Sequence, residues 1–442
     1  MKDHRRLGRE LDLFDTDPLL GAGLPYWLPA GAAVREALEE YVSDVERRAG
    51  YQRVYSPVLG KRELYELSGH WEHYRDDMFP PMNLGGGPDG GSAGEEVVLR
   101  PSLCPHHALI YRARERSYRE LPLRLAELGG MYRAELSGVL GGLTRVRAIQ
   151  LNDAHVFCTL EQVADEALAA LRLIREAYAA MGLDAARYRL SLPGPGAKYV
   201  RDPELWRRAG ALLEKALAAA GIAYDAEEGE AAFYGPKIDV QVLDAAGREA
   251  TLSTVQVDFH QPERFGLAYV GPDGARHRPV MVHRSVVGSA ERAVAQLVEV
   301  HQGAFPPWLA PVQAVVLPVG EAEAAPAQAL LRRCVEAGLR AEAAGPERGT
   351  LGARVRAARL APYQVVVGPR EAAAGAAALR LRDGRRPAPM PAAQAVARMA
   401  AAVAARRPEL WPEGEPGPDG WPAAGSEAGA QAEPGREAVA DR

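Results

Sequence analysis

Between residues 187 and 283 the chain has four strand patterns and one helix pattern, and this order constrains the fold more than any other feature. The strand patterns are 188–194 ("YRLSLPG"), 237–244 ("KIDVQVLD"), 251–259 ("TLSTVQVDF") and 279–283 ("PVMVH"). The helix pattern covers residues 201–220. Parallel strands need a crossover, usually a helix, between each pair, and regular crossovers are missing here. The pattern therefore predicts a largely antiparallel sheet in an α+β domain.

The preceding residues fit the same domain. Amphipathic helices are predicted at 33–48 and 160–181, and another at 287–302. Strands are predicted within 51–59, ending at Pro57, and at 123–135 and 145–151, with a hairpin loop between the last two. Residues 84–94 ("LGGGPDGGSAG") are predicted to form a Gly-rich loop.

The pattern changes after residues 305–311 ("FPPWLAP"). Strands at 312–320, 363–368 and 378–384 alternate with a helix near 324–338, which predicts a small α/β domain. Residues 321–407 hold 15 Arg, 7 Asp or Glu and no Lys, so this domain is basic within a chain of net charge −5. Residues 408–442 hold six Pro, six Gly and eight acids, which predicts a disordered tail. We expect domains at 1–310 and 311–407, followed by that tail.

The composition narrows the class of protein. The three cysteines, Cys104, Cys158 and Cys334, are too few for a disulfide framework and fit a reducing compartment. The first residues, "MKDHRRLGRELDLFD", lack the apolar core of a signal peptide, and no apolar run reaches about 18 residues. We therefore expect a cytoplasmic protein that does not enter a membrane.

Residues 100–107 ("RPSLCPHH") bring a thiol and two imidazoles close together in the sequence. Cys104 could be a metal ligand, a nucleophile or a small buried residue, and buried free cysteines are common. The local sequence does not decide between these roles. The answer depends on which other residues meet Cys104 in the fold.

Long strings in a fixed order cover roughly residues 1–400. They are "DHRRLGRELDLF" (3–14), "SGHWEHYRDDMF" (68–79), "SYRELPLRLAELGGMYRAELSG" (117–138), "AFYGPKIDV" (232–240), "TVQVDF" (254–259) and "VMVHRSVVGSAER" (280–292). In these strings the chain resembles the class II aminoacyl-tRNA synthetases, most closely the threonyl-tRNA synthetases. The resemblance implies an antiparallel catalytic sheet with flanking helices, followed by an α/β anticodon-binding domain.

The resemblance also implies one catalytic zinc ion per chain, held by one Cys and two His. The matching residues are Cys104, His155 and His283. Three protein ligands leave an open position on zinc, where threonine can bind through its amino and hydroxyl groups and valine cannot. Asp153 matches the carboxylate that accepts from the threonine hydroxyl, and Tyr234 matches a residue of the amino-acid pocket.

For ATP, bound with Mg²⁺, the resemblance implies five residues. Arg133 would hold the α-phosphate and the amino-acid carboxylate, and Glu135, two residues later on the same strand face, would read the adenine amino group. Arg145 would reach the γ-phosphate, Arg292 would lie against the adenine and a phosphate, and Gln256 would lie near ATP. Catalysis would consist of positioning and electrostatics, with Arg133 and Arg292 as the catalytic residues.

The chain departs from the family mostly within this site. The usual Met-Asn-Cys-Pro-Gly-His is replaced by Ser102, Leu103, Cys104, Pro105, His106 and His107. An adenine-stacking aromatic is replaced by Ile149 and a glutamine by Leu151, while a loop proline and histidine are replaced by Leu136 and Gly141. Losing the stacking aromatic costs on the order of 1 kcal/mol of ATP binding. His106 is expected either to crowd the metal or to point to solvent.

Since the zinc ligands and both motif arginines remain, we interpret the chain as a divergent paralogue. The resemblance implies a homodimeric threonine–tRNA ligase whose interface includes residues 33–57, and whose tRNA contacts include Glu371 and residues 380–386 ("RLRDGRR"). Editing modules usually precede the family's catalytic domain, so we expect no editing in cis. The alternatives are an inhibitor-tolerant second copy, an adenylating paralogue that passes the amino acid to a carrier protein or a biosynthetic step, and a non-catalytic tRNA-binding protein.

Overall fold

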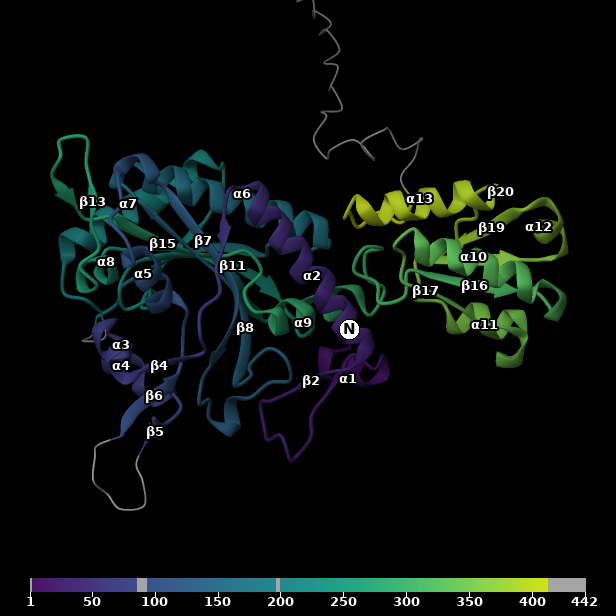
Figure 1. The fold of residues 1–442 in the computed structure, drawn as a ribbon, viewed down its shortest axis with the longest axis horizontal. Coiled ribbons are helices and arrows are strands. Elements are labelled where there is room, and N and C mark those ends of the chain that lie inside the picture. Colours follow the sequence, from purple (N-terminus) through teal and green to yellow (C-terminus); the bar gives the residue numbers. More distant parts are fainter. Residues whose placement is uncertain (1, 86–93, 196–198, 412–442) are drawn as a thin grey trace, which may run out of the picture.

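The computed structural model describes residues 2–85, 94–195 and 199–411. Figure 1 shows two lobes, a larger one built on strands from residues 52–285 and a smaller one built on strands from residues 314–391. Most of the predicted Gly-rich loop (residues 86–93) and most of the predicted tail (from residue 412) lie outside the described residues.

In the described part of the chain, the larger lobe contains one sheet of eight strands. Their spatial order is β10 (Asp225–Glu228), β9 (Arg187–Leu192), β11 (Lys237–Leu243), β12 (Glu249–Asp258), β15 (Val280–Ser285), β8 (Ala148–Cys158), β7 (Leu123–Tyr132) and β3 (Gln52–Arg53). Neighbours are antiparallel except at the two edges, where β10 and β9 and also β3 and β7 are parallel. The predicted antiparallel α+β architecture is confirmed.

Four helices pack on one face of this sheet and share its apolar core. They are α2 (Pro29–Arg48), α6 (Val163–Met181), α7 (Pro203–Ala219) and α9 (Ala290–His301). The short helix α1 (His4–Glu10) packs against α9. Local sequence sets several helix ends: Asp202 and Ser289 cap α7 and α9 with side chains that accept backbone N–H groups, and Gly182 ends α6 in the left-handed conformation.

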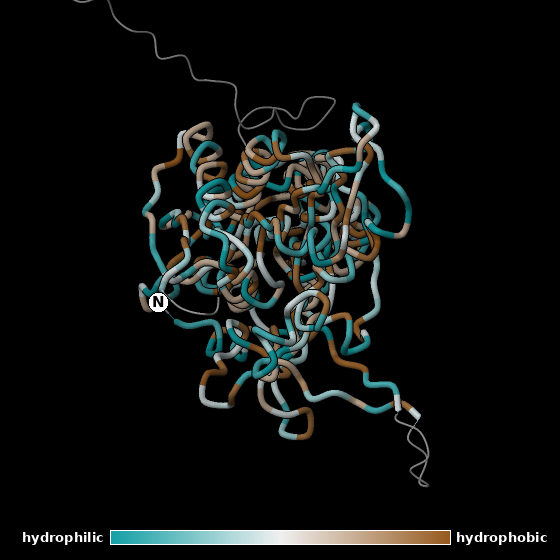
Figure 2. The backbone as a smooth tube through the Cα atoms, turned by 90° about the vertical axis from the view of Figure 1, so that its left-hand side faces the viewer, coloured by the Kyte–Doolittle hydropathy of each residue, from teal (hydrophilic) through white to brown (hydrophobic). Residues whose placement is uncertain are grey.

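Residues 59–112 border the opposite face of the sheet. They form a small sheet and three short helices, namely β4 (Leu59–Lys61), β6 (Glu95–Leu99), β5 (Met82–Leu84), α3 (Arg62–Leu67), α4 (His70–Tyr74) and α5 (Cys104–Arg112). Helix α5 packs through Cys104, Ala108 and Tyr111 against this face, in an apolar cluster with Leu125 and Phe157. In Figure 2, brown apolar and teal polar segments alternate along the chain in the body of the molecule, as expected for elements buried on one side.

The smaller lobe is the predicted α/β arrangement. Its strands, in spatial order, are β17 (Ala341–Ala343), β16 (Ala314–Pro318), β18 (Tyr363–Val367), β19 (Ala376–Leu381) and β20 (Met390–Pro391). The first three are parallel and the last two antiparallel. The helices are α10 (Ala324–Glu336), α11 (Leu351–Ala357), α12 (Pro369–Ala374) and α13 (Ala392–Ala404). Two separate apolar clusters, one with α10 and α13 and one with α11, cover the two faces.

Some element boundaries differ from those predicted. The prediction of one strand within 51–59 is wrong, because only β3 and the start of β4 form there. Pro57 has no N–H to pair, and the buried Arg100 binds the Ser56 and Pro57 carbonyls in place of a strand partner. Strand β8 runs seven residues past the predicted end at Leu151, to Cys158.

No helix in the described residues combines the length and apolar character needed to cross a bilayer.

Candidate active site

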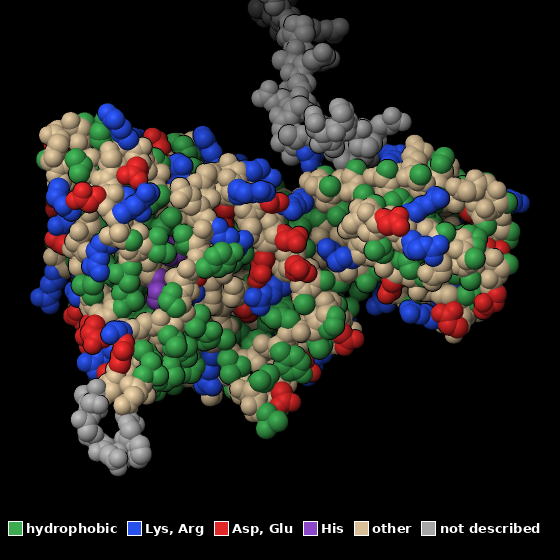
Figure 3. All heavy atoms as spheres, viewed as in Figure 1, with side chains coloured by type: hydrophobic (Ala, Val, Ile, Leu, Met, Phe, Trp, Pro, Cys, Tyr) green, Lys and Arg blue, Asp and Glu red, His purple; other side chains and the backbone are tan. Residues whose placement is uncertain are grey.

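Side chains from adjacent strands of the large sheet line a cavity of about 470 Å³ on the face opposite the four helices. Alternate residues of β8 line it, namely Ile149, Leu151, Asp153 and His155. The intervening residues of β8 point to the other face of the sheet. Of these, Ala154, Val156 and Cys158 pack in the helix-covered core. The same period-two alternation turns Lys237, Asp239, Thr254, Gln256, His283 and Ser285 toward the cavity. In Figure 3, histidine side chains are visible in a hollow of the larger lobe.

All ten site residues predicted from the resemblance line this cavity. They are Cys104, Arg133, Glu135, Arg145, Asp153, His155, Tyr234, Gln256, His283 and Arg292. The fold therefore brings together residues that lie far apart in the sequence, from Cys104 on α5 to Arg292 on α9.

Cys104, His155 and His283 form a buried cluster in which one ligand atom of each lies within 4.8 Å of the others. His155 is directly opposite His283 across the β8–β15 pair, which is how side chains 128 residues apart meet. Cys104, the first residue of α5, reaches the pair from outside the sheet.

Two carboxylates determine which ring nitrogens carry protons. Nε2 of His283 lies 2.9 Å from Asp258, and Nε2 of His107 lies 3.2 Å from Glu127. Carboxylates only accept, so both of these nitrogens are protonated. His107 Nδ1 then accepts from His155 Nδ1, 2.7 Å away. In neutral rings this leaves His155 Nε2 and His283 Nδ1, which are 2.9 Å apart, both without a proton.

Two lone pairs facing each other at this distance repel unless a cation binds them. Burial raises the pKa of the Cys104 thiol to about 12, so a thiolate here also needs a cation. One thiolate and two imidazoles, with further partners that orient the rings, make up a donor set typical of catalytic zinc. The residues present therefore fit a zinc ion.

Cationic side chains gather at the other end of the cavity. Arg292 donates from Nε to the Thr144 carbonyl at 2.9 Å. Burial, together with the charges of Arg133 and Arg145, lowers the pKa of Arg292. Three clustered guanidinium groups fit a polyanion such as the triphosphate of ATP. Glu135 is paired here with Arg145, with Oε2 2.9 Å from Nε.

The remaining predicted residues lie between the two ends. Tyr234 stacks on His283 with ring centroids 4.8 Å apart, and its hydroxyl donates to Gln256 Oε1 at 2.6 Å. Asp153 Oδ1 lies 3.7 Å from His155 Nε2, and burial raises the pKa of this carboxyl to about 6. A small amino acid bound at the Cys104–His155–His283 cluster would therefore touch both Asp153 and Tyr234.

Both lobes of the chain resemble known proteins. Residues 91–301 match the tRNA synthetase class II core domain (G, H, P, S and T), and residues 313–401 match an anticodon binding domain. A solved structure described as the RNA binding domain of threonyl-tRNA synthetase from Cryptosporidium parvum Iowa II superposes with a TM-score of 0.83 and 33% identity, over 91% of this chain and 98% of that one. The chain belongs to the threonyl-tRNA synthetase family of class II enzymes.

Two curated relatives, both named threonine–tRNA ligase, are 49% identical to this chain. They come from Geobacillus sp. strain WCH70 and Bacillus subtilis strain 168, and each alignment covers 86% of this chain. The aligned part is 58% of each relative, so the chain spans less than two thirds of their length. The fold and the order of the two matched domains are those of a class II synthetase.

The residues in which this chain departs from its family lie in and around the cavity. Ile149 and Leu151 line it, so the floor that a stacking aromatic usually provides is aliphatic here. Both expectations for His106 are wrong, because this ring neither lines the cavity nor faces solvent. It is 5% exposed and lies with its centroid 6.3 Å from that of Tyr65. The α5 helix turns successive side chains by about 100°, so His106 points away from the cluster that Cys104 joins.

Sequence reasoning missed three residues beside the Cys104–His155–His283 cluster. His107 and Asp258 orient the rings of His155 and His283, as described above. His70 lies with Nε2 2.9 Å from Ser102 Oγ and 3.6 Å from Cys104 Sγ. The alternation along β12 could have identified Asp258 as facing the same side as Gln256, whereas no sequence pattern indicates where the rings of His70 and His107 point.

Proposed function

We propose that this chain is a threonine–tRNA ligase that activates threonine with ATP and transfers it to tRNA. The observation that carries the proposal is one shared cavity, which has a Cys–His–His cluster beside Asp153 at one end and three arginines at the other. This arrangement would place an amino acid bound at the cluster with its carboxylate facing the α-phosphate of an ATP bound at the arginines.

In this proposal, Cys104, His155 and His283 hold zinc, which would supply a Lewis-acidic position for the amino and hydroxyl groups of threonine. Asp153 accepts a hydrogen bond from the threonine hydroxyl. Tyr234, held by Gln256, closes the pocket around the side chain. Valine has the same shape but offers no hydroxyl to these groups.

ATP, accompanied by Mg²⁺, occupies the arginine-rich end. A threonine carboxylate oxygen attacks the α-phosphorus, and the bond from that phosphorus to pyrophosphate breaks. Arg133 binds the α-phosphate and the carboxylate, Arg145 binds the γ-phosphate, and Arg292 lies against the adenine and a phosphate. Glu135 then releases Arg145 to read the adenine amino group, while Gln256 lies near ATP. No side chain needs to act as a base, because the arginines stabilise the charge that develops.

We further propose a catalytic domain over residues 1–310 and an anticodon-binding domain over 311–407. The arginines of residues 321–407 support an RNA partner. Some of the residues expected to contact tRNA instead make hydrogen bonds within the protein. Glu371 accepts from the Gly368 backbone N–H at 3.0 Å and thereby caps its own helix α12. Arg382 donates to the Phe305 and Leu360 carbonyls.

These internal roles favour a second candidate, in which the chain adenylates the amino acid and passes it to an acceptor other than tRNA. A charging assay with threonine tRNA separates the possibilities. Charging supports the ligase, and adenylate formation without charging supports the second candidate. Binding of tRNA without either reaction indicates a non-catalytic RNA-binding protein.

We also propose a cytoplasmic homodimer. Exposed apolar side chains follow α2 at Tyr55, which is 79% exposed, and continue at Val58 and Leu59. A patch of this kind on a folded surface supports a protein partner. The three buried cysteines, none of them in a disulfide, support a reducing compartment.

Serine is expected to be activated about 10- to 200-fold less efficiently than threonine in kcat/KM for pyrophosphate exchange. Serine keeps the hydroxyl that Asp153 binds and lacks only one methyl group, which is worth this range of discrimination. Valine has the shape of threonine but no hydroxyl, and it serves as the control. Its kcat/KM is expected to be at least about 10⁴-fold below that of threonine. Equal activity with valine and serine would contradict recognition through the hydroxyl.

A further inference from the structure

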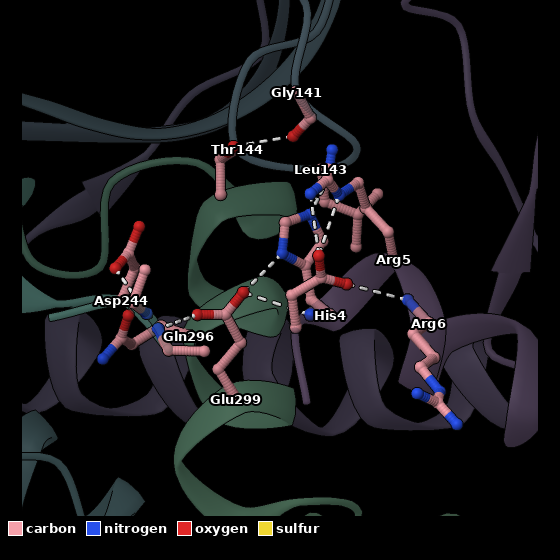
Figure 4. Close-up of polar contacts among 12 residues, drawn as sticks. His4, Arg5, Arg6, Gly141, Leu143, Thr144, Asp244, Gln296 and Glu299 are labelled. Carbon is pink, nitrogen blue, oxygen red and sulfur yellow. Dashed lines mark hydrogen bonds and ion pairs between the residues drawn. The ribbon is translucent and has the colours of Figure 1, made fainter. Parts of the chain in front are cut away.

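Figure 4 shows a polar network around His4 and Glu299. It borders a cavity that shares Thr144, Arg145 and Arg292 with the candidate site. His4, the first residue of α1, is 5% exposed, and its Nδ1 lies 2.7 Å from Oε1 of Glu299 on α9. On the opposite side of the ring, the Leu143 backbone N–H donates to Nε2 over 3.1 Å. The second Glu299 oxygen accepts from the Ala245 backbone N–H at 2.6 Å. One imidazole thus connects α1, α9 and the loop between β7 and β8.

The contacts specify the protonation of this pair. A backbone N–H can only donate, so Nε2 of His4 carries no proton and Nδ1 donates to Glu299. Burial would raise the pKa of Glu299, but hydrogen bonds from the His4 ring and from the His4 and Ala245 backbone N–H groups hold that pKa below its ordinary value. Glu299 is therefore an anion near neutral pH and keeps the His4 acceptor nitrogen turned toward the loop.

The loop segment Gly141–Arg145 carries part of the expected triphosphate site. Its turn is closed by the Thr144 hydroxyl on the Gly141 carbonyl at 2.6 Å and by the Gly141 N–H on the Arg145 carbonyl at 3.2 Å. The Thr144 carbonyl binds Arg292, and Arg145 lines the cavity. Displacing this turn would therefore move Arg145 and remove the hydrogen bond that holds Arg292.

A second cavity of about 660 Å³ borders this turn, lined in part by His4, Gly141, Thr144 and Glu299. The buried Leu143 side chain and its N–H bond to His4 hold the turn in place. At Gly142, which has a φ of +58°, an added Cβ would lie 2.3 Å from Nε2 of His4, so only glycine permits this close approach.

We propose that His4 and Glu299 are positioning residues that fix the Gly141–Arg145 turn, and thereby place Arg145 and Arg292 for the triphosphate of ATP. The inference rests on the proposed function in taking ATP as the ligand. The pair itself touches no substrate and acts through the Leu143 backbone.

Two substitutions of His4 separate this role from a general contribution to folding. The side chain of His4→Gln can place an acceptor near the position of Nε2, whereas that of His4→Asn reaches only the position of Nδ1. We expect His4→Asn to raise the KM for ATP about tenfold in pyrophosphate exchange, because the buried Leu143 N–H loses its acceptor. His4→Gln should stay within about threefold of the wild type, since its acceptor can be kept. The KM for threonine should change in neither variant, since Asp153 and Tyr234 lie on other elements.

Hydrogen–deuterium exchange of the peptide that contains Leu143 gives a readout independent of activity. We expect faster exchange in His4→Asn than in His4→Gln, and wild-type exchange in Arg6→Ala, a control on the exposed side of α1 whose side chain contacts Glu10. Equal exchange of this peptide in the two His4 variants, with equal KM for ATP, overturns the inference. If both variants fail to fold, Gly142→Ala tests the same contact with His4 intact, and unchanged exchange there also overturns it. Absence of pyrophosphate exchange in the wild type would count against the proposed function, while the deuterium result would still decide the role of His4.

Discussion

Replacing Arg133 with alanine is expected to slow threonine-dependent ATP–pyrophosphate exchange by about 10²–10³-fold, the usual effect of removing one preorganised donor to a transition-state charge. Arg133 lines the cavity, and its buried Nε has no hydrogen-bond partner among the described residues. The guanidinium is therefore available to the α-phosphate, where negative charge develops as the carboxylate attacks.

Two further variants make this result specific. Arg133→Lys keeps the charge but loses the planar fork of donors, so an intermediate rate is expected. Arg119→Ala removes an exposed arginine outside the cavity and should leave the rate unchanged. A wild-type exchange rate in Arg133→Ala would show that this side chain does not stabilise the transition state.

The second large effect is expected for Cys104→Ala, which should weaken zinc binding by more than the roughly 10–100-fold typical of losing an outer partner of a ligand. The variant should also lose threonine-dependent exchange. Cys104 is one of the three side chains in the buried cluster. Without its thiolate, only the two imidazoles of His155 and His283 would remain to bind the metal. Metal content after dialysis, measured by plasma mass spectrometry, checks the expectation.

Cys158→Ala is the matched control. Cys158 is also buried and lies at the end of β8, the strand that carries His155, but it faces the helix-covered core. Its replacement should leave zinc content unchanged. Full zinc occupancy in Cys104→Ala would remove Cys104 from the proposed ligand set.

The architecture of the larger lobe could be predicted because its strand patterns are long and follow one another without regular crossovers. The alternation that defines a strand also determines its faces, so Asp153 and His155 share a side once β8 is known. The register between strands could not be predicted in this way. That His155 lies opposite His283 depends on pairing between strands 128 residues apart, and no local pattern encodes it.

The site residues could therefore be predicted from the resemblance to the family but not from their spacing. The resemblance gave no correct prediction where this chain departs from the family. His106 occupies a position that is usually glycine in the family, and its burial depends on its tertiary contact with Tyr65 of α3. The network of His4 was equally hidden, since its three contacts come from a helix, a loop and a turn that are distant in the sequence. Two of those contacts involve backbone N–H groups, which every residue except proline carries.

The central claim is tested most directly by amino-acid-dependent ATP–pyrophosphate exchange on protein with measured zinc content, using threonine, serine and valine in parallel. The account predicts exchange with threonine, weaker exchange with serine and none above background with valine. No exchange with any of the three, in protein that contains zinc, would contradict it.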